Sequence, residues 1–213
     1  MEYKKGADVI SKDGEKIGTL ERVVINPKTK EVAYLVVKSG FLLTEDKLIP
    51  MDQVGTVTEN QIHVMATKEK LDELPRFEEE HYVPLDKEGE GIDLYYWYPP
   101  VGWGASGYYP PFPQPLYKRK TEQNIPENMV ALKEGAKVIA SDGEHIGNIE
   151  RILTDAKNEA VTHLVVSSGL LQKERKLVPT YWLTDVSEDE VHLSVDSHDF
   201  DRLPDFVLKI DEV

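Results

Sequence analysis

The stretch GADVISKDGEKIGTLERVVI, residues 6–25, returns later in the chain as GAKVIASDGEHIGNIERILT, residues 135–154. The two stretches align at an offset of 129 residues, and the alignment continues without a gap to Phe77 in the first copy and Phe206 in the second. Of the 72 aligned positions, 30 are identical. This agreement indicates a duplicated domain, and the period is too long for a solenoid, whose units span about 20–50 residues.

Each copy has the pattern of short β-strands separated by turns. Asp13-Gly14 and Asp142-Gly143 predict tight turns, because glycine adopts a positive φ without strain. Further strands are expected at 9–10 and 138–139, at 16–25 and 145–154, at VAYLVV and VTHLVV, at KLIP and KLVP, and around hairpin turns at Glu59-Asn60 and Glu188-Asp189. Gly18 and Gly147 interrupt the long strands and indicate a bulge or a barrel corner.

These elements predict an all-β protein. Five or six short strands within about 60 residues, with turn signals between them, favour a small closed β-barrel in each copy. Short helices are expected at 67–74 and 197–203, each ended by a proline, with Ser197 as the N-cap of the second. The predicted domains are residues 1–80, a connector of residues 81–128, and residues 129–213.

The shared motif of both copies runs from an apolar strand through DG, IG and a glutamate to V-x-x-LVV-x-SG and finally KL-x-P. This motif resembles the PRC-barrel family, small β-barrels named after the H subunit of the photosynthetic reaction centre. The resemblance covers both repeats and leaves residues 78–134 unexplained. It implies two tandem barrels that act as a protein-binding module without catalysis of their own.

Composition limits the function classes. The chain has 213 residues, a formal net charge of −14 and no cysteine, which excludes thiol nucleophiles, disulfides and cysteine-ligated metals. A protein this acidic repels phosphate backbones, so nucleic acid is not an expected partner. No apolar stretch of signal-peptide length opens the sequence, and a cytoplasmic location is therefore expected.

The middle of the connector, residues 95–117, is rich in aromatic residues and proline. It holds nine of the eighteen aromatic residues and six of the thirteen prolines, and no residue from 94 to 117 is charged. The prolines and glycines exclude a membrane-spanning helix. Nine rings of roughly 150–250 Å² each offer about 1,400–2,200 Å², far more than the roughly 300–600 Å² of an exposed patch on a soluble monomer. The segment is therefore expected to be packed.

The residues that pack against this segment are left open by the sequence. They could belong to the chain's own barrels, to a second copy of the chain in a homo-oligomer, or to a different protein that accepts proline-rich ligands. Aromatic residues beside Lys118-Arg119-Lys120 would suit peripheral contact with a membrane, but the net charge opposes it.

Two further features indicate interaction surfaces. The loop after the central strand is apolar in both copies, and it either plugs the barrel end or presents an apolar tip to a partner. After the KL-x-P strand, Tyr181 and Trp182 replace Asp52 and Gln53 of the first copy, and something apolar is expected to cover them. The predicted partner or self-interaction residues are Tyr95, Tyr96, Trp97, Tyr98, Trp103, Tyr108, Tyr109, Phe112, Tyr181, Trp182, Phe41, Leu42, Leu170 and Leu171.

No catalytic constellation is found, and no cofactor is expected. His63 and His192 occupy the same repeat position and are interpreted as half-exposed strand residues. The richest group of potential metal ligands is DSHDFD, residues 196–201, but helix capping explains most of its acidic residues. The sequence predicts a non-enzymatic interaction module, an adaptor or assembly factor. The alternative is a barrel that binds a small ligand or a metal.

Overall fold

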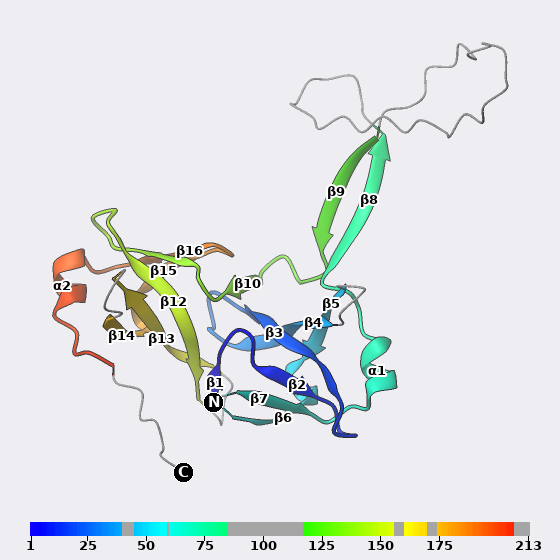
Figure 1. Cartoon of the computed structure of the whole chain (residues 1–213). Coiled ribbons are helices and arrows are strands. Elements are labelled where there is room, and N and C mark those ends of the chain that lie inside the picture. The colour runs from blue at the N-terminus through cyan, green and yellow to red at the C-terminus, as the bar shows by residue number, and fades with distance from the viewer. Residues whose placement is uncertain (40–44, 59, 85–116, 156–159, 170–173, 207–213) are drawn as a thin grey trace, which may run out of the picture. The chain divides into compact units, whose positions relative to one another are not determined.

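The computed structural model describes residues 1–39, 45–58, 60–84, 117–155, 160–169 and 174–206. The chain forms two compact units, Met1–Phe77 with Ile125–Val213, and Glu78–Asn124. Both repeats belong to the first unit, where their strands form two seven-stranded sheets (Figure 1). The all-β class predicted from the sequence is confirmed.

The first repeat contributes six strands to one sheet, in the order β5-β4-β3-β2-β7-β6. Its elements are β2 (Asp8–Ile10), β3 (Lys16–Ile25), β4 (Val32–Ser39), β5 (Glu45–Pro50), the 3-10 turn η1 (Met51–Gln53), β6 (Val54–Val57), β7 (Gln61–Val64) and α1 (Lys68–Asp72). All neighbouring strands are antiparallel except β2 and β7, which are parallel.

The second repeat has the same topology, β14-β13-β12-β11-β16-β15. Its elements are β11 (Lys137–Ile139), β12 (His145–Thr154), β13 (Val161–Ser168), β14 (Glu174–Pro179), η2 (Thr180–Trp182), β15 (Leu183–Val186), β16 (Glu190–Leu193) and α2 (Ser197–Asp201). The long strands β3 and β12 have the bounds that the sequence predicted.

The seventh strand of each sheet comes from the other repeat. β1 (Glu2–Tyr3) pairs with β12 of the second repeat, and β10 (Val130–Lys133), which leads into the second repeat, pairs with β3 of the first. Tyr3 pairs with Ile152 and Leu132 with Val23, and the offset of 129 residues relates these two pairs. The repeats therefore exchange their leading strands about an approximate two-fold axis.

The exchanged strands are part of the core. One hydrophobic cluster contains buried residues from both repeats, and Tyr3 and Leu132 lie in it with 2% and 0% of their surfaces exposed. Full burial of a large apolar side chain stabilises a fold by about 1.5–3 kcal/mol. Each sheet is thus completed, and partly buried, by residues that belong to the other copy of the repeat.

Gly18 and Gly147 have the role that the sequence predicted, at points where the long strand passes close to its neighbour. A Cβ on Gly18 would lie 2.2 Å from the carbonyl oxygen of Lys38, and one on Gly147 would lie 2.6 Å from that of Ser167. The register between β2 and β3, and between β11 and β12, shifts beside these glycines. Only a residue without a side chain fits there.

The closed barrel predicted for each copy is not present as a continuous ladder in the described part of the chain. β5 does not pair with β6 there, and β14 does not pair with β15. Instead, β5 forms a hydrogen bond with the segment that follows α1. The amide of Phe77 donates to the carbonyl of Asp46 on β5, 2.7 Å away. Phe206 and Arg175 form the equivalent bond at β14, 2.6 Å long.

The described part of the second unit contains two antiparallel strands, β8 (Glu78–Pro84) and β9 (Tyr117–Gln123), which were not predicted from the sequence. Exposed ion pairs line it, among them Arg119 with Glu80 at 3.2 Å. β8 begins with three glutamates in a row and β9 contains three cations in a row, and such runs of like charge do not give the apolar/polar alternation of a half-buried strand. Among the described residues, no helix is both long and apolar enough to cross a membrane.

One helix cap differs from the prediction. Asp196, and not Ser197, is the N-cap of α2, and its carboxylate accepts a hydrogen bond of 2.8 Å from the amide of Asp199. Ser197 is the first helical residue, and its hydroxyl donates to the carboxylate of Asp142, 2.8 Å away. The prediction of Ser197 as N-cap was wrong. Serine and aspartate both suit the N-cap position, so the sequence does not choose between Ser197 and Asp196. The choice depends on the hydrogen bond between Ser197 and the distant Asp142.

Candidate functional site

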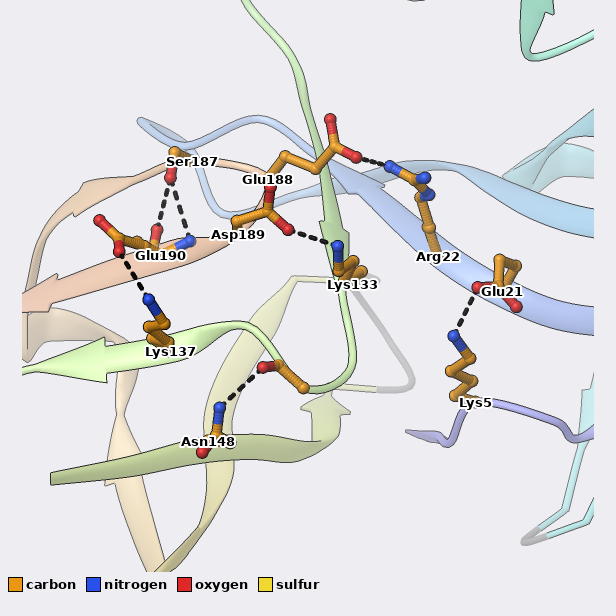
Figure 2. Close-up of polar contacts among 11 residues, drawn as sticks. Lys5, Glu21, Arg22, Lys133, Lys137, Asn148, Ser187, Glu188, Asp189 and Glu190 are labelled. Carbon is orange, nitrogen blue, oxygen red and sulfur yellow. Dashed lines mark hydrogen bonds and ion pairs between the residues drawn. The ribbon is translucent and has the colours of Figure 1, made fainter. Parts of the chain in front are cut away.

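The main group of polar contacts between the repeats lies where the exchanged strands meet β3 and β12 (Figure 2). We call this group the seam. Because the seam joins two copies of one sequence, each contact can be compared with its counterpart at the offset of 129. The charged residues of the seam are Glu2, Lys5, Arg22, Lys133, Glu134, Arg151, Glu188 and Asp189.

Arg22 and Arg151 occupy the same repeat position, and each is paired with a carboxylate of the other repeat. The side chain of Arg151 is 5% exposed and contacts Glu2 of the exchanged strand β1. The side chain of Arg22 is 17% exposed and contacts Glu188, which follows β15. A buried guanidinium without an acidic partner is costly, so each repeat supplies a group that the other needs.

Arg22 has a second contact within its own repeat. Its guanidinium lies 5.1 Å from the centroid of the Phe77 ring, a cation–π geometry. Phe77 is fully buried in a small cluster with Val24 and Leu48, and Ala131 of the exchanged strand β10 covers the same cluster. Arg22 therefore connects the end of the first repeat to the second repeat.

Lys5 and Glu134 are also repeat equivalents, yet they have opposite charges and contact each other. The backbone N–H of Lys5 donates to the Glu134 carboxylate, and the Lys5 ammonium pairs with Glu21 at 2.5 Å. Burial raises the pKa of Glu134, while the N–H of Lys5 lowers it to a smaller extent. Contact between equivalent positions places this pair close to the two-fold axis.

A second pair of repeat-equivalent residues, Glu31 and Ala160, meets at another point close to the two-fold axis. Glu31 and Ala160 form an isolated antiparallel bridge, and the amide of Val161 donates to the carbonyl of Lys30 at 2.7 Å. Lys30 has a φ of 64°, an uncommon conformation for a residue with a side chain. The repeats thus touch through matching segments at both places.

The turn between β15 and β16 is held against the strands that lead into the second repeat (Figure 2). Lys133 pairs with Asp189, and Lys137 pairs with Glu190 at 3.6 Å. The hydrogen bond from Lys133 lowers the pKa of Asp189. These contacts fix the turn that presents Glu188 to Arg22.

The seam was not predicted from the sequence, although one signal was available. Glu21-Arg22 and Glu150-Arg151 place a charged pair inside an otherwise apolar strand, at the same position of both copies. A charge there must find a partner when the strand is buried. The sequence does not show which distant acids provide that partner.

Two other shared motif residues have structural roles. The ammonium of Lys176 donates to the carbonyls of Asp201 and Leu203 at 3.0 and 2.9 Å, and thereby binds the end of α2. Lys47 makes the equivalent bonds to Asp72 and Leu74 at the end of α1. The lysine of the KL-x-P motif is thus a clamp for the terminal helix.

The histidines and acids considered as ligands are dispersed. His63 is exposed on β7, and His192 is half-buried on β16. In the DSHDFD stretch, Asp196 caps α2 and Asp199 lies 3.8 Å from Arg202. In the parts of the chain that the structure describes, no three histidine or acidic side chains are grouped as a metal site.

Most of the interaction residues predicted from the sequence lie outside the described residues. These are the eight aromatic residues from Tyr95 to Phe112, together with Phe41, Leu42, Leu170 and Leu171. Tyr181 and Trp182 are described and form an edge-to-face pair with ring centroids 6.2 Å apart. Tyr181 is 80% exposed, whereas Trp182 is partly buried and packs against the core. The pair is therefore an anchored aromatic surface on the second repeat.

Comparison with known proteins agrees with this architecture. The PRC-barrel domain family matches the chain twice, at residues 5–71 and at residues 134–200, which together make up more than half of its length. Both matched regions begin after the exchanged strands β1 and β10 and end inside α1 and α2. No curated protein matches the sequence. The chain therefore belongs to the PRC-barrel family, of which it carries two tandem copies.

Proposed function

We propose that this protein is a non-enzymatic interaction module, an adaptor or assembly factor, which docks a protein segment at the surface formed by Tyr181 and Trp182. The observation that carries the proposal is the exposure of Tyr181 on a fixed support. Its ring is 80% exposed, while its neighbour Trp182 packs against the core. Large aromatic residues of this kind are enriched among the residues that dominate binding energy at protein interfaces.

The difference between the two repeats supports the proposal. Asp52 and Gln53 take the places of Tyr181 and Trp182 in the first repeat, in the equivalent turn η1. The fold therefore does not require aromatic residues at these positions. An aromatic residue as exposed as Tyr181, at a position where the first repeat has Asp52, is better explained by binding than by folding.

The docked segment in this proposal is aromatic and rich in proline, as residues 95–117 are. Proline-rich segments bind surfaces lined by aromatic side chains at a low entropic cost, because their extended conformation is already restricted. The segment could come from a second copy of the chain or from another protein. Either source makes this protein a component of a larger assembly.

A binding measurement tests the proposal. The receptor is the full chain in which residues 95–117 are replaced by a Gly/Ser sequence of equal length, and the probe is a labelled peptide of residues 94–117. We expect saturable binding by fluorescence anisotropy. The double variant Tyr181→Asp, Trp182→Gln should abolish it, whereas Asp52→Asn on the first repeat should not.

The same variants are compared in the full-length chain by mass in solution. If the peptide does not bind, and if Tyr181→Asp changes neither self-association nor the binding of any identified partner, this surface is not a docking site and the proposal fails. Circular dichroism should confirm that each variant is folded before binding is interpreted.

A further inference from the structure

We infer that the seam is a docking surface with built-in specificity, through which the two repeats recognise each other as unlike partners. The seam, rather than the covalent connector, then holds the pair together. Neither repeat would form an equally good pair with a second copy of itself. This inference concerns the first unit alone and does not rest on the proposed function.

A like pair is a pair of two first repeats or of two second repeats. Its geometry follows from the two-fold relation between the repeats. At the offset of 129, Glu2 corresponds to Ala131 and Tyr3 to Leu132, and the strands they lie on are paired in equivalent registers with β12 and β3. Two copies of either repeat could therefore exchange leading strands in the same way. Whether they would do so depends on the side chains that meet in the seam.

A pair of second repeats would lose its most buried ion pair. The strand placed on β12 would then be β10, so Ala131 would stand where Glu2 stands now. Arg151, whose side chain is 5% exposed, would lose the carboxylate of Glu2. Near the axis, Glu134 would face a second Glu134 in place of Lys5. Glu188 of the other copy would then stand beside Arg151 as it now stands beside Arg22, so the loss of Glu2 weakens the pairing of this guanidinium without abolishing it. The two Glu134 carboxylates would repel each other, because like charges that meet in an interface are unfavourable.

A pair of first repeats is disfavoured in a different way. The backbone N–H of Lys5 would lose the Glu134 carboxylate that accepts from it, because a second Lys5 would stand in that place. Arg22 would keep an acidic neighbour, because Glu59 is the repeat equivalent of Glu188. The ion pair of Lys133 with Asp189 would be lost, because Asn60 stands at the position of Asp189 in the first repeat. Tyr3 would also have to fit against Val23, in the place that the smaller Leu132 fills with 0% of its surface exposed. Specificity of this kind combines favourable contacts in one pair with unfavourable contacts in the others.

The test keeps the full chain and cuts it only after folding. Two specific protease sites are inserted, one between Phe77 and Glu78 and one between Asn124 and Ile125, so that cleavage of the folded protein also removes β8 and β9, and the mass is then measured in solution. We expect the two fragments to remain a 1:1 complex at micromolar concentration. After denaturation and refolding of the cleaved mixture, native mass spectrometry should show the mixed pair in large excess over either like pair.

A matched pair of variants probes the seam itself. Glu2→Gln keeps the shape of the side chain but removes the charge beside Arg151, and it should weaken the association of the fragments at least tenfold. Glu144→Gln removes an equivalent charge from an exposed turn of the second repeat and should change the association less than twofold. Separation of the fragments on cleavage, formation of like pairs in amounts comparable to the mixed pair, or equal effects of the two variants would each overturn the inference.

Discussion

The backbone N–H of Lys5 donates to the carboxylate of Glu134, and the two residues occupy the same position of the two repeats. In a symmetric dimer this position would meet its own copy. Duplication within one chain has allowed the two positions to differ, so that a carboxylate on one side of the axis now accepts from the backbone N–H on the other. The seam is thus the place where two nearly equal domains have become complementary.

Replacement of Glu134 by glutamine should stabilise the protein at neutral pH. Burial raises the pKa of Glu134, so the fold favours its protonated form and the ionised form opposes folding above that pKa. Glutamine is neutral and can still accept from the N–H of Lys5. We expect a higher melting temperature for Glu134→Gln than for wild type at pH 7, and a smaller difference near pH 4.

Glu188→Gln provides the contrast, because Arg22 would lose its charged partner. This variant should lower the melting temperature at pH 7. If both glutamine variants shift the melting temperature in the same direction, the assigned roles of the two glutamates are wrong.

The clamp lysine of the second repeat should contribute more to stability than that of the first. Lys176 has a side chain that is 7% exposed and donates to two helix carbonyls, and Asp205 lies 3.5 Å away. Lys176→Met should lower the free energy of unfolding by about 2–3 kcal/mol, as expected for hydrogen bonds from a charged group. Lys47→Met, at the less buried equivalent, should cost about 1 kcal/mol. Urea unfolding measures both, and equal costs would contradict the role of burial.

Alanine at the two strand glycines should be strongly destabilising. The new Cβ would lie 2.2 Å from the Lys38 carbonyl oxygen at position 18 and 2.6 Å from the Ser167 carbonyl oxygen at position 147. Both oxygens belong to the backbone, so the strands would have to move apart, at a cost of about 1–3 kcal/mol or more. Gly55→Ala, whose Cβ would lie 3.1 Å from the His63 carbonyl oxygen, is the milder control. If Gly55→Ala proved the least stable of the three variants in urea unfolding, this account would be wrong.

Asp142 should stabilise α2 at pH values above its own pKa and not at pH values below it. Its carboxylate accepts from both the amide and the hydroxyl of Ser197, at 3.0 and 2.8 Å, and these bonds lower its pKa. A depressed pKa gives stability that is present above the ordinary value of about 3.9 and is lost as the pH falls through the folded value. Asp142→Ala should therefore reduce the melting temperature at pH 7, with the difference shrinking below about pH 4.

The equivalent Asp13 makes a weaker contact, 3.4 Å from the amide of Lys68. Asp13→Ala should accordingly have the smaller effect at pH 7. An unchanged difference between Asp142→Ala and wild type across the acidic range would show that the carboxylate charge is not what supports the helix.

The sequence by itself determined the repeated unit of this protein. The turn at Asp13-Gly14, the break at Gly18 and the buried strand after it are local signals, because each depends on backbone conformation or on alternation within a few residues. The same signals appear again 129 residues later, and the family match follows from them. The clash that a Cβ would make at Gly18 is the physical reason for one of these signals.

Only the tertiary structure decided how the two repeats are joined. The exchanged strands β1 and β10 are too short to show periodicity, and their partners lie in the other repeat, more than 100 residues away in the chain. The acid that pairs with Arg22 lies in the second repeat, and the acid that pairs with Arg151 lies at the start of the first. Pairing over such distances is set by packing and by the need to neutralise a buried charge. A charge inside an apolar strand shows that a partner is needed, but the residues beside it do not show which distant acid provides it.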